Sequence, residues 1–247
     1  MPCRSAIELN FMAITHRISP LPPAERTDFI LEHCRGKSVL HVGCTNFPNT
    51  AAKIQTGTLL HGRLRDVATV LHGVDVDAEG IELLTRSGFK DVFVLDVRRL
   101  NADHPVLLPA YDVVVLGDVI EHVGDPETSV AEAASRLEND GELIVSVPNA
   151  FYLFGILCMI VRRDLTSPEH VAWYSQVALI EILRRRGFRV TTIRGYYEYP
   201  TNRSLIIRTL KAMERGLHRL LPGFTSGIIC CASRRRDDPF DMIEYTC

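Results

Sequence analysis

The chain has 247 residues, of which 46% are hydrophobic and 23% are charged, as is ordinary for a globular protein. These proportions exclude a fibrous repeat and a chain dominated by disorder, and they predict one large α/β domain or two small ones. With 28 basic and 30 acidic residues the formal charge is -2. Such a balance does not draw a protein to nucleic acid or to an anionic membrane, so we expect no nucleic-acid partner.

The seven cysteines form no C-x-x-C pair and no Cys/His cluster at zinc-ligand spacing. We therefore expect neither a disulfide framework nor a metal site. The first twenty residues contain no continuous apolar core and no small-residue cleavage site of the kind that export signals carry. The longest apolar run, Phe151 to Val161, is far shorter than the roughly 20 residues that span a bilayer. These features favour a cytoplasmic protein without stable membrane insertion.

Residues 1–36 are predicted to form an N-terminal leader and a helix: the leader ends in a Pro-rich stretch before residue 24, and the helix follows at Ala24–Cys34. From Lys37 onward, short β-branched runs alternate with helical stretches, which indicates successive βα units and a mainly parallel sheet. The first five strands are predicted at Ser38–Val42, Thr69–Val74, Val92–Leu95, Tyr111–Leu116 and Glu142–Val147. The helices between them are predicted at Thr50–Leu59, Ala78–Ser87 and Pro126–Glu138.

The third of these helices has clear start and stop signals in its sequence. Asp125 and Pro126 occupy its cap and first-turn positions, and Asn139-Asp140-Gly141 is expected to end it and turn the chain into the fifth strand. The main domain spans residues 37–234 with inserts at 150–171 and 196–224, and residues 235–247 form a tail. A last helix and two further strands are predicted at Ser175–Arg186, Phe188–Ile193 and Gly227–Ala232.

Three consecutive strands end in residues suited to a nucleotide-like ligand. Gly43 follows the first strand, where ligands of open α/β sheets sit, although one such glycine is often only a tight turn. Asp75 ends the second strand and can accept two hydrogen bonds from a ribose diol. Asp96 ends the third and can accept one from an adenine amino group. Each aspartate alone is equally consistent with a solvated carboxylate, but together the three favour a nucleoside-bearing cofactor.

The most specific stretch follows the fourth strand, where the chain reads YDVVVLGDVIEHVGDP, then GELIVSVPN, then HVAWYSQVALIEILRRRGF. This order resembles the class I S-adenosylmethionine-dependent methyltransferases, in particular the branch with methyltransferases of ubiquinone biosynthesis and of glycan and natural-product pathways. The resemblance covers about residues 37 to 195 and, more weakly, the last strand. It implies a Rossmann-like, seven-stranded, mostly parallel sheet with helices on both faces and an antiparallel last strand.

The resemblance also implies S-adenosylmethionine as cofactor, with its methionine part at the first loop, its ribose at Asp75 and its adenine near Asp96. The implied cofactor contacts are Gly43, Cys44, Asn46, Asp75, Val76, Asp96, Val97, Gly117 and Asp118. The chain departs from the pattern in its first loop. Relatives usually have an acidic residue where His41 stands and glycines where Thr45 and Phe47 stand, and these two residues restrict the backbone more than glycine does.

A sulfonium methyl group is already activated, so its transfer needs mainly positioning, with a base if the acceptor is a hydroxyl. His122 is the first candidate for that base, and the alternative is a hydrogen bond to the start of the following helix. His170 lies near the end of the first insert. It either faces the acceptor from the opposite wall or packs a loop against a helix. Glu121, Tyr152, Trp173 and Tyr174 are the candidate substrate contacts, although for Glu121 the sequence favours a surface carboxylate at the entry of a helix.

The implied reaction is methyl transfer to oxygen or nitrogen of a small molecule or sugar. Phe151–Val161 is predicted to be either a helix buried on the domain or a lid over the acceptor. Two other functions stay open. The altered loop at Thr45 and Phe47 is consistent with a non-catalytic or partner-dependent protein, and Asp75 would suit a nicotinamide-dependent oxidoreductase, although the chain lacks a G-x-G-x-x-G. The oligomeric state is open, a homodimer being one option.

Overall fold

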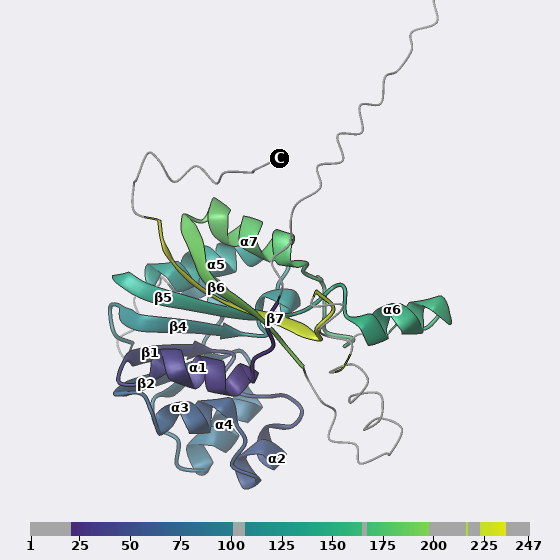
Figure 1. Ribbon diagram of the computed structural model, residues 1–247. Helices are drawn as coiled ribbons and strands as arrows, with labels where there is room; N and C mark the ends of the chain where they lie inside the picture. Colours follow the sequence, from purple (N-terminus) through teal and green to yellow (C-terminus); the bar gives the residue numbers. More distant parts are fainter. Residues whose placement is uncertain (1–20, 101–106, 165–166, 198–215, 217–222, 236–247) are drawn as a thin grey trace, which may run out of the picture.

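The computed structural model describes residues 21–100, 107–164, 167–197, 216 and 223–235 (Figure 1). The leader before Leu21, most of the insert at 196–224 and the tail after Arg235 lie outside the described residues. One seven-stranded sheet runs in the order β3-β2-β1-β4-β5-β7-β6. Strands β1 to β5 pair in parallel, and β7 runs antiparallel to both β5 and β6. The expected fold class is confirmed.

The strands are β1 (Ser38–Val42), β2 (Val70–Asp75), β3 (Val92–Val94), β4 (Tyr111–Gly117), β5 (Leu137–Pro148), β6 (Phe188–Tyr196) and β7 (Gly227–Arg234). The α-helices are α1 (Arg26–Cys34), α2 (Thr50–Gln55), α3 (Leu60–Arg65), α4 (Ala78–Arg86), α5 (Pro126–Ser135), α6 (Leu153–Ile160) and α7 (Gln176–Arg185). Two single-turn helices, η1 (Val97–Arg99) and η2 (Ile120–His122), follow β3 and β4. Each predicted strand has its counterpart in the sheet.

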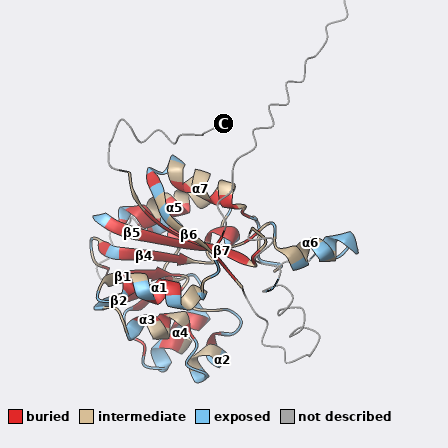
Figure 2. Cartoon of the chain, viewed as in Figure 1, coloured by how far each residue is buried: buried red, intermediate tan, exposed pale blue. Residues whose placement is uncertain are grey.

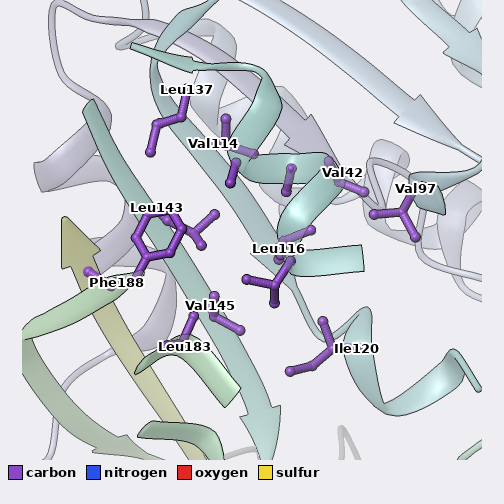
Figure 3. Packing of buried hydrophobic residues seen from close by; sticks show 14 of the residues in the cluster. Val42, Val97, Val114, Leu116, Ile120, Leu137, Leu143, Val145, Leu183 and Phe188 are labelled. Carbon is purple, nitrogen blue, oxygen red and sulfur yellow. The ribbon is translucent and has the colours of Figure 1, made fainter. Parts of the chain in front are cut away.

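Two apolar layers hold helices against the two faces of the sheet. Successive side chains of a strand point to opposite faces. Leu40 and Val42 of β1 accordingly belong to the cluster beneath α5 and α7, whereas Val39 belongs to the cluster beneath α1 and α3. Burial is densest along the central strands (Figure 2), and both Phe188 of β6 and Leu143 of β5 belong to the first cluster (Figure 3).

The predicted helix at Thr50–Leu59 is wrong in its extent. The structure has two short helices there, α2 and α3, and the second was not predicted. Gly57 between them has a φ of +65°, a left-handed conformation that ends a helix and that glycine adopts without strain. The second helix is needed for packing, because it buries His61 and Leu64 against the sheet.

The predicted end of the third helix is also wrong. Helix α5 ends at Ser135, and Asn139-Asp140-Gly141 lies inside β5 instead of before it. The chain joins the sheet early because Leu137 pairs with Tyr111 and is buried. Pairing resumes at Val113 and Glu142, so the residues between them form an irregularity that absorbs the turn-forming sequence.

Helix α6 is not the buried helix that was one of the two expectations for the first insert. None of its residues is buried, and it stands away from the sheet with apolar side chains exposed (Figures 1 and 2). Among the described residues, no helix has the length and apolarity that crossing a bilayer requires. The remaining expectation, a lid over the acceptor, stays a prediction.

A buried histidine pair joins β1 to α3. The Nδ1 atoms of His41 and His61 lie 3.3 Å apart, and the two rings stack. Burial, with a smaller contribution from Arg65, lowers the pKa of His61 to about 4. Burial, the neighbouring His61 and Arg26 lower the pKa of His41 well below its ordinary value. Both rings are therefore neutral at neutral pH, so one can donate to the other.

This pair makes the free energy of unfolding depend on pH. In the unfolded chain both imidazoles take up protons near their ordinary pKa of about 6.5, but in the folded chain His61 does so only near pH 4. Between these values the unfolded state binds more protons, so stability falls as the pH is lowered. We expect His61→Gln to reduce this slope by up to about 1.4 kcal/mol per pH unit. Urea unfolding between about pH 7 and pH 4 measures it, and equal slopes in variant and parent would show that another group is responsible.

Candidate active site

Gly43 forms the turn at the end of β1. Its φ is +76°, and a Cβ atom there would lie 2.7 Å from Cγ2 of Val119. Its N–H donates to the carbonyl of Val74 in the neighbouring strand at 2.9 Å. Only glycine fits this turn, because any side chain would be strained and would also meet the segment that follows β4.

Asp75, at the end of β2, holds the first loop in place. Its Oδ2 accepts hydrogen bonds from the backbone N–H of Thr45 at 3.0 Å and from the Thr45 hydroxyl at 2.7 Å. Its Oδ1 accepts from the N–H of Asp77 at 3.0 Å. The departure from glycine at Thr45 thus has a structural use, since the hydroxyl joins the loop to the carboxylate. Val76 beside it is 68% exposed and offers an apolar surface at the same edge.

The other predicted cofactor residues lie in differing environments. Asp96 caps η1, and its ion pair with Arg98 lowers the pKa of the Asp96 carboxyl. The side chains of Val97 and Cys44 are buried in the apolar clusters, where burial raises the pKa of the Cys44 thiol. Asn46 stays at the loop surface, its N–H bonded to the hydroxyl of Thr50. Of these four side chains, Cys44 and Val97 therefore face the interior.

Asp118, the residue after β4, is the centre of a polar junction. It has a φ of +56°, and its carboxylate forms an ion pair with Arg26 of α1 at 2.7 Å. Oδ1 accepts from the hydroxyls of Ser146 on β5 and Tyr196 on β6, both at 2.8 Å. Gly117 precedes this junction, and a Cβ atom there would lie 2.8 Å from the Arg26 guanidinium. Sequence reasoning missed Arg26, Ser146 and Tyr196, because they come from three segments far from Asp118 along the chain.

Beyond Asp118, η2 presents Glu121 and His122 beside His170 of the first insert. The two imidazole rings lie 4.8 Å apart in an edge-on arrangement. Nδ1 of His122 lies 3.2 Å from the carbonyl oxygen of Glu169, so Nδ1 is the donor of this bond and, in the neutral ring, Nε2 is the acceptor. The partner of His122 is thus this carbonyl and not the start of the next helix. Burial and the neighbouring His122 lower the pKa of His170.

Glu121 is 0% exposed, so its interpretation as a surface carboxylate is wrong. Its backbone carbonyl accepts hydrogen bonds from the N–H groups of Val171 and Ala172, at 2.9 and 3.3 Å. These bonds hold the chain after His170 against η2. Two segments that are separate in the sequence are therefore held side by side, and His170 lies next to His122.

The aromatic residues predicted to contact substrate differ in exposure. Tyr174 is buried, its hydroxyl donates to the carbonyl of Ile120 at 3.1 Å, and burial with the nearby Glu121 raises its pKa to about 12. Trp173 is 48% exposed, and Tyr152 stands at the start of α6 with its ring 6.3 Å from that of Phe154. Tyr174 thus supports the wall, whereas Trp173 is available to a ligand.

A separate cavity of about 380 Å³ lies between α7 and β6, with Ile180, Phe188 and Val190 among its lining residues. None of the predicted site residues lines it. The chemistry-bearing side chains gather instead at the carboxyl ends of β1, β2 and β4, where ligands of open α/β sheets bind.

Comparisons with known proteins agree with this arrangement. Residues 12–193 match the family described as methyltransferase domain. Ubiquinone biosynthesis O-methyltransferases are similar in sequence. The one from Klebsiella pneumoniae (strain 342) is 31% identical over 186 residues, 67% of this chain and 71% of that protein. The one from Vibrio atlanticus is 29% identical over 198 residues, which are 75% of this chain and 76% of that protein. The match to the Erwinia tasmaniensis protein, at 32% identity, spans about half the length of that relative (51%).

Solved structures show the same fold. A methyltransferase from Archaeoglobus fulgidus that depends on S-adenosylmethionine has a TM-score of 0.56 at 18% identity, covering 85% of this chain and 91% of that one. The N-methyltransferase NodS from Bradyrhizobium japonicum was solved with S-adenosylhomocysteine. It has a TM-score of 0.53 at 14% identity, and the match covers 85% of this chain and 86% of that one.

The residues fit the cofactor that this family uses. Gly43 leaves the backbone of the first loop bare of a side chain, and Asp75 places a carboxylate at the next strand end. No comparison above is to a nicotinamide-dependent oxidoreductase, and the family match argues against that alternative. With its fold, its strand-end residues and a family match over most of its length, the chain belongs to the methyltransferase-domain family and is a class I S-adenosylmethionine-dependent methyltransferase.

Proposed function

We propose that the protein methylates a hydroxyl oxygen of a small molecule, a sugar hydroxyl being included. The observation that carries this proposal is the pairing of a cofactor edge at Gly43 and Asp75 with an imidazole pair at His122 and His170. Oxygen is favoured over nitrogen because the similar curated proteins are named O-methyltransferases. An alcohol also needs help to lose its proton, which an imidazole supplies.

At the cofactor edge, Asp75 combines two tasks. Its three hydrogen bonds come from Thr45 and Asp77, and a carboxylate has about four lone-pair sites. The remaining capacity suits a ribose hydroxyl. Val76 offers an apolar contact to the cofactor, and the carboxylate of Asp96 offers a hydrogen-bond acceptor for its adenine. Gly43, Asn46, Gly117 and Asp118 surround the remaining part of the cofactor.

We call the group formed by His122, His170 and Trp173 the acceptor edge. The methyl group of the sulfonium is already activated, so the protein mainly positions the nucleophile there. His122 is fixed by its hydrogen bond to Glu169, which leaves Nε2 as the proton acceptor. The His170 ring lies beside that of His122, and Trp173 offers an exposed aromatic face for the acceptor. Glu121 and Tyr152 complete the proposed contacts.

The alternative of a non-catalytic or partner-dependent protein rested on the loop residues Thr45 and Phe47. Thr45 is accounted for by its bonds to Asp75, and Phe47 is exposed at the rim of the loop. Calorimetry with S-adenosylhomocysteine separates the two functions. A catalytic protein binds it unaided, and absence of binding at millimolar concentration would contradict the proposed function.

We expect Asp75→Ala to weaken S-adenosylhomocysteine binding by about 1–3 kcal/mol, the scale of a lost charge-assisted hydrogen bond. Because Asp75 also holds the loop, Thr45→Val is the matched control: it removes one bond to the carboxylate but keeps the carboxylate. Calorimetry should show a clearly smaller loss for Thr45→Val. Equal losses would mean that Asp75 acts only through the loop.

We expect His122→Ala to lower turnover about 100-fold while cofactor affinity stays unchanged, because the imidazole serves the acceptor and not the cofactor. Release of S-adenosylhomocysteine in the presence of hydroxylated small molecules measures turnover, and calorimetry measures affinity. His33 lies on α1, away from the carboxyl ends of the strands, so His33→Ala is the control and should keep full turnover. Undiminished turnover of His122→Ala would remove this residue from the chemistry.

A further inference from the structure

We propose that residues 236–247, which follow β7, bind in the cavity between α7 and β6 and cover the outer edge of β6. We call these twelve residues the acidic tail. Its charged residues are Arg236, Asp237, Asp238, Asp241 and Glu244. Its large apolar residues are Phe240, Met242, Ile243 and Tyr245. This inference is independent of the methyl transfer proposed above.

The outer edge of β6 is covered at one end only. The N–H of Gly195 donates to the carbonyl of Pro22 at 3.1 Å, and the N–H of Ala24 donates to the carbonyl of Gly195 at 2.9 Å. From Phe188 to Arg194, no strand besides β7 pairs with β6 in the part of the chain that the structure describes. Such an edge presents backbone donors and acceptors to any extended segment that can reach it.

The cavity runs along this uncovered part of β6, beside α7 (Figure 1). Its helical wall is one face of α7, because Gln176, Ile180 and Arg184 are spaced four residues apart. Exposed residues of β6 also line it, so the cavity opens to solvent. Its apolar lining residues are Ile180, Phe188, Val190 and Ile193. The apolar side chains of the acidic tail have a matching surface there.

The charge of the cavity is opposite to that of the acidic tail. Arg184, Arg189 and Arg235 line the cavity, and none of the lining residues is acidic. Arg184 forms an ion pair with Glu181 at 2.7 Å, so part of its charge is already balanced. The lining as a whole is nevertheless positive, and it attracts a segment with four carboxylates.

Gln176 provides an observation that does not depend on charge. Its side chain is only 7% exposed, and its Oε1 accepts no hydrogen bond from the residues that the structure describes. A buried carbonyl oxygen is rarely left without a donor. Because Gln176 lines the cavity, a backbone N–H of a bound segment supplies the donor that this oxygen lacks.

The acidic tail begins at the cavity and is long enough to fill it. The N–H of Arg235 donates to the carbonyl of Gly187, in the turn between α7 and β6, at 2.8 Å. The strand from Phe188 to Ile193 is about 17 Å long at roughly 3.3 Å per residue. Twelve extended residues span about 40 Å. A short tether also holds the tail at a millimolar effective concentration, which favours it over a free acidic peptide.

Two other occupants fit less well. A second copy of the chain, paired edge to edge through β6, would bring two sets of the same arginines together. Residues 1–20 carry two arginines and one acidic residue, so they do not complement the cavity. To extend the bridge at Gly195 along β6 they would also need an N–H at residue 22, and Pro22 has none.

Hydrogen exchange of the 247-residue chain, followed by mass spectrometry of peptides that cover residues 188–194 and 237–247, tests this placement. The test variant has its tail carboxylates neutralised by Asp237→Asn, Asp238→Asn, Asp241→Asn and Glu244→Gln. All four changes lie beyond β7, so the sheet keeps its own residues. We expect both regions to exchange about tenfold faster in this variant than in the parent, because the tail leaves the edge of β6.

A change on the domain side should have the same effect. Arg189→Glu removes a positive charge from the cavity and should release the tail, and combining it with the neutralised tail should add little further exchange, because both changes act on one contact. Arg163→Glu is the matched control. It makes the same charge change in the segment after α6, outside the cavity, and should leave exchange of both regions unchanged.

Three outcomes would overturn the inference. The first is equal exchange of residues 237–247 in the parent and in the variant with the neutralised tail. The second is protection of residues 188–194 that increases with protein concentration, which identifies a second copy as the occupant. The third is protection of residues 188–194 that survives neutralisation of the tail and is accompanied by protection of residues 1–20, which identifies the leader as the occupant.

Discussion

The turn at Gly43 is the constraint on which the site depends. β1 lies between β2 and β4 in the sheet, so the chain leaves the end of β1 at the point where strand order reverses. Because Val119 packs against the bare α-carbon of Gly43, the first loop and the segment after β4 come together there. A side chain at this position would push the first loop away from the segment after β4.

Asp118 connects the segment after β4 to the rest of the domain. Its carboxylate is bonded to side chains of α1, β5 and β6, so helix, parallel strands and antiparallel strands meet at one group. Partly buried charges are stable only when paired and hydrogen-bonded, and this one has three partners. The left-handed conformation of Asp118 then directs the chain into η2, which carries Glu121 and His122.

The segments around His122 and His170 are held by hydrogen bonds, whereas the neighbouring helix α6 is exposed. Hydrogen bonds to Glu121, Ile120 and Glu169 fix the histidines and Tyr174. Helix α6, in contrast, projects with its apolar side chains in solvent. In the proposed function, the part held by hydrogen bonds is what positions the nucleophile. Strand-end residues held by hydrogen bonds thus lie on the domain, whereas α6 projects from it.

Sequence by itself determined the succession of strands and most of the helices, the N-terminal cap of α5, and the strand-end residues Gly43 and Asp75, because these follow from local periodicity and turn chemistry. Tertiary structure alone decided that Arg26, Ser146 and Tyr196 meet at Asp118, that Glu121 is buried, and that His170 reaches His122. Those contacts join segments far apart in the chain, and their geometry is set by sheet order and by packing. No local pattern records which distant side chain a strand end will meet.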